Sequence, residues 1–141
     1  MANSAVTNVG GVPEGGNQGD VLTKNTGANY DVNWTPNSNK VCLQYTIPDP
    51  ENRTYKLFQY VPVAFTLEDI YYDLDAGTCS LNVRLESVSV GGWSTLSATT
   101  SEGTASATSN DSVAVGDTLD LVVSSVSSAD MLSITIVGTE T

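Results

Sequence analysis

Apolar and polar residues alternate along most of the chain after residue 40, which is the pattern of β-strands with one buried face. The clearest run is residues 79–86, where Cys79, Leu81, Val83 and Leu85 alternate with polar side chains. Shorter runs with the same period of two lie at 41–46, 55–60, 61–65, 70–74, 119–123 and 132–136. Short strands separated by turn residues are typical of sandwiches and jelly rolls. The pattern therefore predicts an all-β domain over residues 41–141, an antiparallel, jelly-roll-like β-sandwich.

The runs are separated by turn signals. Pro48-Asp49-Pro50 ends the first run, Asp75-Ala76-Gly77 predicts a turn, and Gly91-Gly92 predicts the turn of a hairpin. The alternation changes phase near Ser87, which indicates a bulge or break. Residues 94–112 are mostly Ser, Thr, Ala and Gly, so we expect them to form an exposed sheet edge.

Residues 1–40 have a different composition, rich in Gly, Asn, Thr and Pro with isolated apolar residues. Such a segment cannot build a core of its own, yet Val21, Leu22 and Trp34 are costly to leave in water. We therefore expect an extended N-terminal attachment arm over 1–40 that becomes ordered on a partner surface or on other copies of the chain.

The charge is concentrated in the second part of the chain. The formal net charge is −11, and residue 61 onward contributes eleven acidic residues against one basic residue, Arg84. Nucleic-acid binding needs Lys and Arg to displace counterions from phosphate, and the whole chain has five, so the composition argues against a nucleic-acid partner. An anionic membrane surface is disfavoured for the same reason.

The beginning of the chain has no basic segment followed by an apolar one, as a signal peptide has, and no apolar run approaches the length of a membrane span. We expect a soluble protein that is made in a cytosol.

Catalytic and metal-binding arrangements are hard to assemble from these residues. The chain has no His, so a Ser-His-Asp or Cys-His arrangement is excluded within one chain. The carboxylates Glu68, Asp69, Asp73 and Asp75 are the one cluster that suits a glycosidase, but their alternation with apolar residues favours a solvated strand face. Asp73-Leu-Asp75-Ala-Gly77 begins like a calcium loop, but Arg84 stands where an EF-hand needs Glu. We expect no enzyme activity, no metal and no cofactor.

Aromatic side chains and cysteines leave alternatives open. Trp93, Tyr71 and Tyr72 are candidate glycan-binding residues, because aromatic rings stack on sugars. Trp93 begins a strand after a turn, however, and such an aromatic is more often a core or interface residue. The two cysteines, Cys42 and Cys79, are interpreted as small buried apolar residues in strands, although they would pair if the fold brought them together.

Two stretches resemble bacteriophage virion proteins. Residues 11–34 contain Pro13-Glu14-Gly15-Gly16, then Gly19, Val21-Leu22-Thr23-Lys24, and finally Tyr30-Asp31-Val32 and Trp34. This succession is similar to a module that recurs in phage tail-fibre, head-fibre and decoration proteins. The course of residues 65–136, with less identity, is similar to β domains of phage structural proteins.

The resemblance implies a trimeric protein that attaches to a virion. The chain has no long repetitive shaft, so we expect a capsid decoration (cement or head-fibre) protein rather than a tail fibre. Its homotrimer would bind the major capsid protein on the outer capsid surface through Val12, Pro13, Glu14, Val21, Leu22, Tyr30 and Trp34. The alternative is a tail-fibre tip or receptor-binding protein that recognises host-surface glycans.

Overall fold

A computed structural model of the 141-residue chain describes residues 18, 20–24, 32–35 and 39–141. The chain divides into two units, Met1–Ser38 and Asn39–Thr141. In the first unit, β1 (Val21–Lys24) pairs with β2 (Val32–Thr35) in an antiparallel ladder that places Leu22 opposite Trp34. The described part of the expected arm is therefore a two-stranded hairpin and not an unpaired extended chain.

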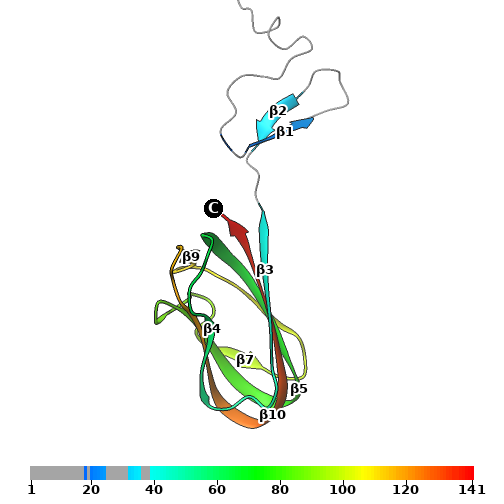
Figure 1. Ribbon diagram of the computed structural model, residues 1–141. Helices are drawn as coiled ribbons and strands as arrows, with labels where there is room; N and C mark the ends of the chain where they lie inside the picture. The colour runs from blue at the N-terminus through cyan, green and yellow to red at the C-terminus, as the bar shows by residue number, and fades with distance from the viewer. Residues whose placement is uncertain (1–17, 19, 25–31, 36–38) are drawn as a thin grey trace, which may run out of the picture. The chain divides into compact units, whose positions relative to one another are not determined.

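The second unit contains eight strands and confirms the predicted all-β, antiparallel, sandwich-like class (Figure 1). Two of them are long, β5 (Phe65–Leu85, 21 residues) and β10 (Leu119–Glu140, 22 residues). The others are β3 (Lys40–Ile47), β4 (Arg53–Phe58), β6 (Val88–Ser89), β7 (Leu96–Ala98), β8 (Gly103–Ser106) and β9 (Ser112–Val113).

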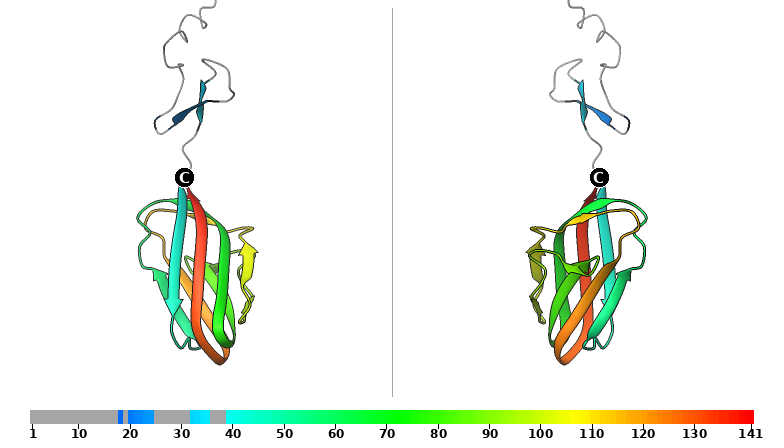
Figure 2. Two further views of the ribbon diagram at one scale, coloured as in Figure 1. Left: turned by 90° about the vertical axis from the view of Figure 1, so that its right-hand side faces the viewer. Right: turned by 90° about the vertical axis from the view of Figure 1, so that its left-hand side faces the viewer.

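The sandwich is one sheet folded over on itself. β5 and β10 pair along nearly their whole length, and each belongs to both layers (Figure 2). In the first layer, β3 pairs with the end of β10, while β8 and β9 pair with the beginning of β5. In the second layer, β4 pairs with the beginning of β10, while β6 and β7 pair with the end of β5.

The fold gives the sandwich two different ends. At the bend end, β5 and β10 turn from one layer into the other near Gly77 and Ser124–Asp130, where the ladder has two register shifts. Gly77 has a φ of +74°, and a Cβ there would lie 2.2 Å from the Ser128 carbonyl oxygen, so this bend requires glycine. At the other end, the Asn39 end, the Glu140 N–H donates to the Asn39 carbonyl at 2.8 Å.

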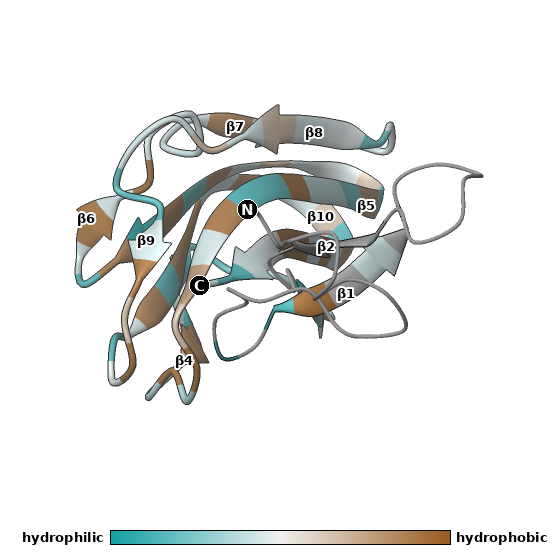
Figure 3. Cartoon of the chain, turned by 90° about the horizontal axis from the view of Figure 1, so that it is seen from above, coloured by the Kyte–Doolittle hydropathy of each residue, from teal (hydrophilic) through white to brown (hydrophobic). Residues whose placement is uncertain are grey.

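The core lies between the layers and comes mainly from β5, β10 and residues 90–113. Alternating hydrophobic and hydrophilic positions are visible along β5 (Figure 3). The fully buried side chains include Trp93, Leu67, Ile70, Leu81, Leu119, Leu121, Leu132 and Ile136. The apolar side chains of the two strands β3 and β4 pack against this core but are only partly buried: Val41, Leu43, Tyr45, Ile47, Tyr55, Leu57 and Phe58. The core is therefore less well covered along β3 and β4.

The structure has a hairpin turn at Glu86-Ser87, whereas the sequence predicted one at Gly91-Gly92. The phase change near Ser87 is the hairpin between β5 and β6, in which Leu85 pairs with Val88. Both connecting residues have positive φ, +50° at Glu86 and +68° at Ser87, as in a type I′ turn. Gly91-Gly92 does form a turn, but β6 and β7 on either side of it both pair with β5 and not with each other. The hairpin prediction at the glycines was therefore wrong.

Candidate functional site

Trp93 lies in the core and is 0% exposed. Gly92 has a φ of +83°, and the Trp93 N–H donates to the Val90 carbonyl at 3.0 Å, so a tight turn directs the indole inward. The indole Nε1 donates to the Ala105 carbonyl at 3.1 Å, which satisfies its one polar group. The candidate role of Trp93 in glycan binding was therefore wrong, because no face of its ring is accessible to a sugar.

Tyr71 and Tyr72 point to opposite sides of β5, as neighbours in a strand do. Tyr72 is 8% exposed, and its ring lies where a side chain at Gly103 would be: a Cβ there would come within 2.4 Å of the ring. Tyr71 is 39% exposed on the outer face of the first layer. Of the three aromatic candidates, only Tyr71 offers an exposed ring.

A shallow pocket of about 220 Å³ lies beside Tyr71. It is lined by Tyr71, Tyr72, Asp73, Glu102, Ser133 and Thr135. The ladder explains this grouping, because Asp73 lies opposite Ser133 and Tyr71 lies opposite Thr135. Carboxylate and hydroxyl oxygens around an exposed ring can accept hydrogen bonds from a polyol while the ring covers its apolar face. The pocket is therefore chemically suited to a small sugar.

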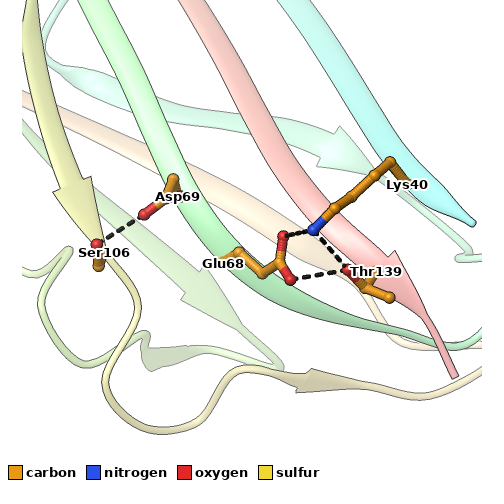
Figure 4. Close-up of polar contacts among 5 residues, drawn as sticks. All are labelled: Lys40, Glu68, Asp69, Ser106 and Thr139. Atoms are coloured by element: carbon orange, nitrogen blue, oxygen red, sulfur yellow. Dashed lines mark hydrogen bonds and ion pairs between the residues drawn. The ribbon is translucent and has the colours of Figure 1, made fainter. Parts of the chain in front are cut away.

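Two other carboxylates of the predicted cluster, Glu68 and Asp69, make structural contacts (Figure 4). Glu68 accepts hydrogen bonds from Lys40 Nζ at 2.6 Å and from Thr139 Oγ1 at 2.7 Å, and these contacts lower its pKa. Asp69 accepts a hydrogen bond from Ser106 Oγ at 2.6 Å. A general acid at neutral pH needs a raised pKa, so the lowered pKa of Glu68 is opposite to what a glycosidase acid requires. These contacts tie β3, β5, β8 and β10 together across the outer face.

A second polar cluster lies on the outer face of the second layer. Asp120 is 7% exposed between Lys56, whose Nζ is 3.7 Å away, and Arg84, whose Nη2 is 3.6 Å away. These distances are long for direct hydrogen bonds, and Asn82 Oδ1, Arg84 Nε and Asp120 Oδ1 are buried without one. The cluster carries two ion pairs, so we interpret it as part of the sheet face.

The structure describes only some of the predicted arm residues. Val12, Pro13, Glu14 and Tyr30 lie outside the described residues. Val21, Leu22 and Trp34 lie in the β1–β2 hairpin, and Val21 is exposed.

The two cysteines are both free and differ in environment. Cys79 is buried, as predicted, and burial raises the pKa of its thiol, which makes it unreactive. Cys42 is exposed on the edge strand β3, so its interpretation as a buried residue was wrong. The alternation of residues 41–47 does indicate that Cys42 is exposed, because Cys42 shares a strand face with the polar residues Gln44 and Thr46.

Over residues 18, 20–24, 32–35 and 39–141, no group of three or more Cys, Asp or Glu side chains is arranged to hold a metal ion. The same residues include no helix that is long and apolar enough to cross a membrane. No protein-family model matches the chain, and no curated protein matches it significantly.

Proposed function

We propose that the chain is a non-enzymatic structural protein of a bacteriophage virion: a capsid decoration protein of the cement or head-fibre type. In this proposal a homotrimer, made in the host bacterial cytoplasm, binds the major capsid protein on the outer surface of the head. Residues 11–34 carry the proposal, because their succession of motifs resembles the attachment module of phage fibre and decoration proteins.

The division of the chain supports this role. Every buried core residue among those that the structure describes lies in the unit from residue 39 onward, which is consistent with attachment being left to residues 1–38. Residues 39–141 hold 13 acidic and 4 basic side chains, a net charge of −9. Such a charge on an outward-facing domain keeps particles apart in solution.

The proposed mechanism is mechanical. Each arm lies in a groove between capsid subunits, and three arms on one trimer bind one locus together. Individually weak contacts then gain through multivalency. Clamping neighbouring capsid subunits stabilises the head against the outward pressure of packaged DNA.

The experiment compares the full chain with residues 39–141 in co-sedimentation with capsids that lack the protein. The shorter protein retains every strand of the sandwich and is expected to fold, which circular dichroism checks. We expect saturable binding of the full chain and loss of binding by the shorter one. If residues 39–141 bind capsids as tightly as the full chain, attachment through the arm is refuted.

A second candidate function is a receptor-binding tail tip, which the pocket beside Tyr71 favours. It predicts binding to host cells or host polysaccharide that is lost in Tyr71→Ala. Tyr60→Ala is the matched control, because Tyr60 is also exposed but does not line this pocket. Equal binding by both variants would remove the glycan site from consideration.

A further inference from the structure

Three exposed apolar side chains, which we call the end patch, lie in two loops of the sandwich. Tyr60 and Val63 belong to the loop between β4 and β5, and Val115 belongs to the loop between β9 and β10; they are 62%, 44% and 55% exposed. Single exposed apolar residues are ordinary on a protein surface. These two loops, however, contribute three of the five large apolar side chains that are exposed in the unit Asn39–Thr141.

Hydrogen bonds hold the two loops side by side. The Val61 N–H donates to the Asp117 carbonyl at 3.0 Å, and the Gly116 N–H donates to the Val61 carbonyl at 2.8 Å. The Tyr60 ring lies beside Gly116, because a Cβ there would be 3.5 Å from the ring. The Val61 side chain is 0% exposed and anchors its loop in the core. The end patch is therefore one surface made by both loops.

A tight turn displays the side chain of Val115. The Asp117 N–H donates to the Ala114 carbonyl at 3.2 Å, and the Asp117 carboxylate accepts a hydrogen bond from the Ala114 N–H at 2.9 Å. Val115 and Gly116 are the two central residues, and Gly116 has a φ of +94°, as a type II turn requires at this position. Both ends of the turn are thus bonded to each other, so the fold keeps Val115 in its exposed position.

The two loops are uncharged, although the unit to which they belong is strongly acidic. Residues 59–64 and 112–116 contain no charged side chain, whereas residues 39–141 carry a net charge of −9. Grouped apolar side chains that remain exposed mark interaction sites. The end patch fits an apolar strip on another protein, because two apolar surfaces gain free energy by leaving water together.

The position of the end patch selects the partner. Val63 lines a pocket together with Lys40, the second residue of the sandwich unit, so the patch adjoins the place where the sandwich begins. Four peptide bonds connect Thr35, the last residue of β2, to Asn39, and they span at most about 14 Å. A protein surface that binds residues 11–34 is therefore held beside the end of the sandwich that carries the patch.

We propose that the end patch docks on an apolar strip of the same capsid protein surface that binds residues 11–34. This inference rests on the proposed attachment through the arm and adds a second contact to it. An arm tethers a domain without orienting it, whereas a contact at the Asn39 end also fixes the sandwich with its bend end away from the capsid. Because the short connection gives the patch a high effective concentration at that surface, even a small apolar contact raises the affinity.

The test is saturation binding of full-chain variants to capsids that lack the protein, measured by co-sedimentation. Tyr60→Ala and Val115→Ser each truncate the end patch at an exposed position, so the melting temperature should stay unchanged. We expect each to raise the concentration at half-saturation about tenfold, as loss of an interface anchor does. Tyr71→Ala is the matched control, because Tyr71 is also an exposed tyrosine but lies on the outer face of β5. It should bind capsids like the wild type.

Hydroxyl-radical footprinting locates the contact on the wild-type chain without any substitution. Oxidation of Tyr60 should fall sharply when capsids are added, because its ring leaves water, while oxidation of Tyr71 should stay the same. Equal oxidation of Tyr60 with and without capsids would overturn the docking surface.

The remaining outcomes separate this inference from the proposed function. If Tyr60→Ala and Val115→Ser bind capsids as tightly as the wild type, or if Tyr71→Ala loses as much affinity as they do, the end patch is overturned and attachment through the arm stands. A molar mass of these two variants below that of the wild type, measured by light scattering without capsids, would show that the patch binds a second copy and would overturn docking on the capsid. A wild-type chain that does not bind capsids would overturn the proposed function and this inference with it.

Discussion

Replacing Trp93 by Ala tests whether this residue acts in the core, as its burial indicates, or at a binding surface. The side chain is 0% exposed, and truncating a buried Trp costs about 3–5 kcal/mol through lost burial and the cavity left behind. The change also removes the hydrogen bond from the indole to the partly buried Ala105 carbonyl, and such a bond contributes about 0.5–1.5 kcal/mol. Because these contributions overlap, we expect a loss of about 4–6 kcal/mol in the free energy of unfolding.

That loss is large for a unit of this size. Residues 39–141 number 141 − 38 = 103, and a domain of that length has a stability of about 5–15 kcal/mol. The assay is urea unfolding followed by circular dichroism. Trp93→Phe keeps a ring and should lose about 1–2 kcal/mol. Tyr60→Ala, at an exposed aromatic, should stay within about 0.5 kcal/mol of the wild type. A Trp93→Ala loss below about 1 kcal/mol would refute the account of the core.

Three further predictions concern pH and the bend. The folded pKa of Tyr45, about 12, lies above its ordinary value of 10.0, so its contribution is complete below pH 10 and is lost as the pH rises toward 12. After discounting for partial exposure we expect about 1 kcal/mol, measured as the difference in alkaline unfolding between the wild type and Tyr45→Phe. Hydrogen bonds from the Thr118 backbone and hydroxyl lower the pKa of Glu86, so its contribution is present above about pH 4.5 and is lost as the pH falls through the lowered value. Acid unfolding of Glu86→Gln should therefore be less steep, and an identical acid curve would contradict this contact. Gly77→Ala should cost at least about 2 kcal/mol in urea unfolding because of positive φ and the clash with Ser128, and a neutral effect would show that the bend can shift.

The fold class was predictable because a period of two directly reports a strand with one buried face. The turn predicted at Asp75-Ala76-Gly77 was wrong, because β5 continues through these residues and only bends between the layers there. Glu86-Ser87 was missed as a hairpin turn, because neither residue is a usual choice for positive φ. The pairing of Val21–Lys24 with Val32–Thr35 was missed because short, polar strands give little alternation.

The candidate site was harder to predict, since it depends on register. The pairing of β3, β5 and β10 decides which carboxylate Lys40 contacts. Lys40 lies 28 positions from Glu68 and 99 positions from Thr139 in the sequence. Sequence alternation did place Tyr71 and Tyr72 on opposite sides, but not the burial of Tyr72 against Gly103. Trp93 was assigned two roles because the sequence cannot tell whether a turn directs the next residue into the core or outward.

The most direct test of the proposed function is saturable co-sedimentation of the full chain, in parallel, with capsids lacking it and with host cells. The account predicts that the chain pellets with capsids, saturates at a fixed number of copies per capsid, and stays in solution with cells. Pelleting with cells and not with capsids would contradict capsid decoration, and it would make Tyr71 the first residue to mutate.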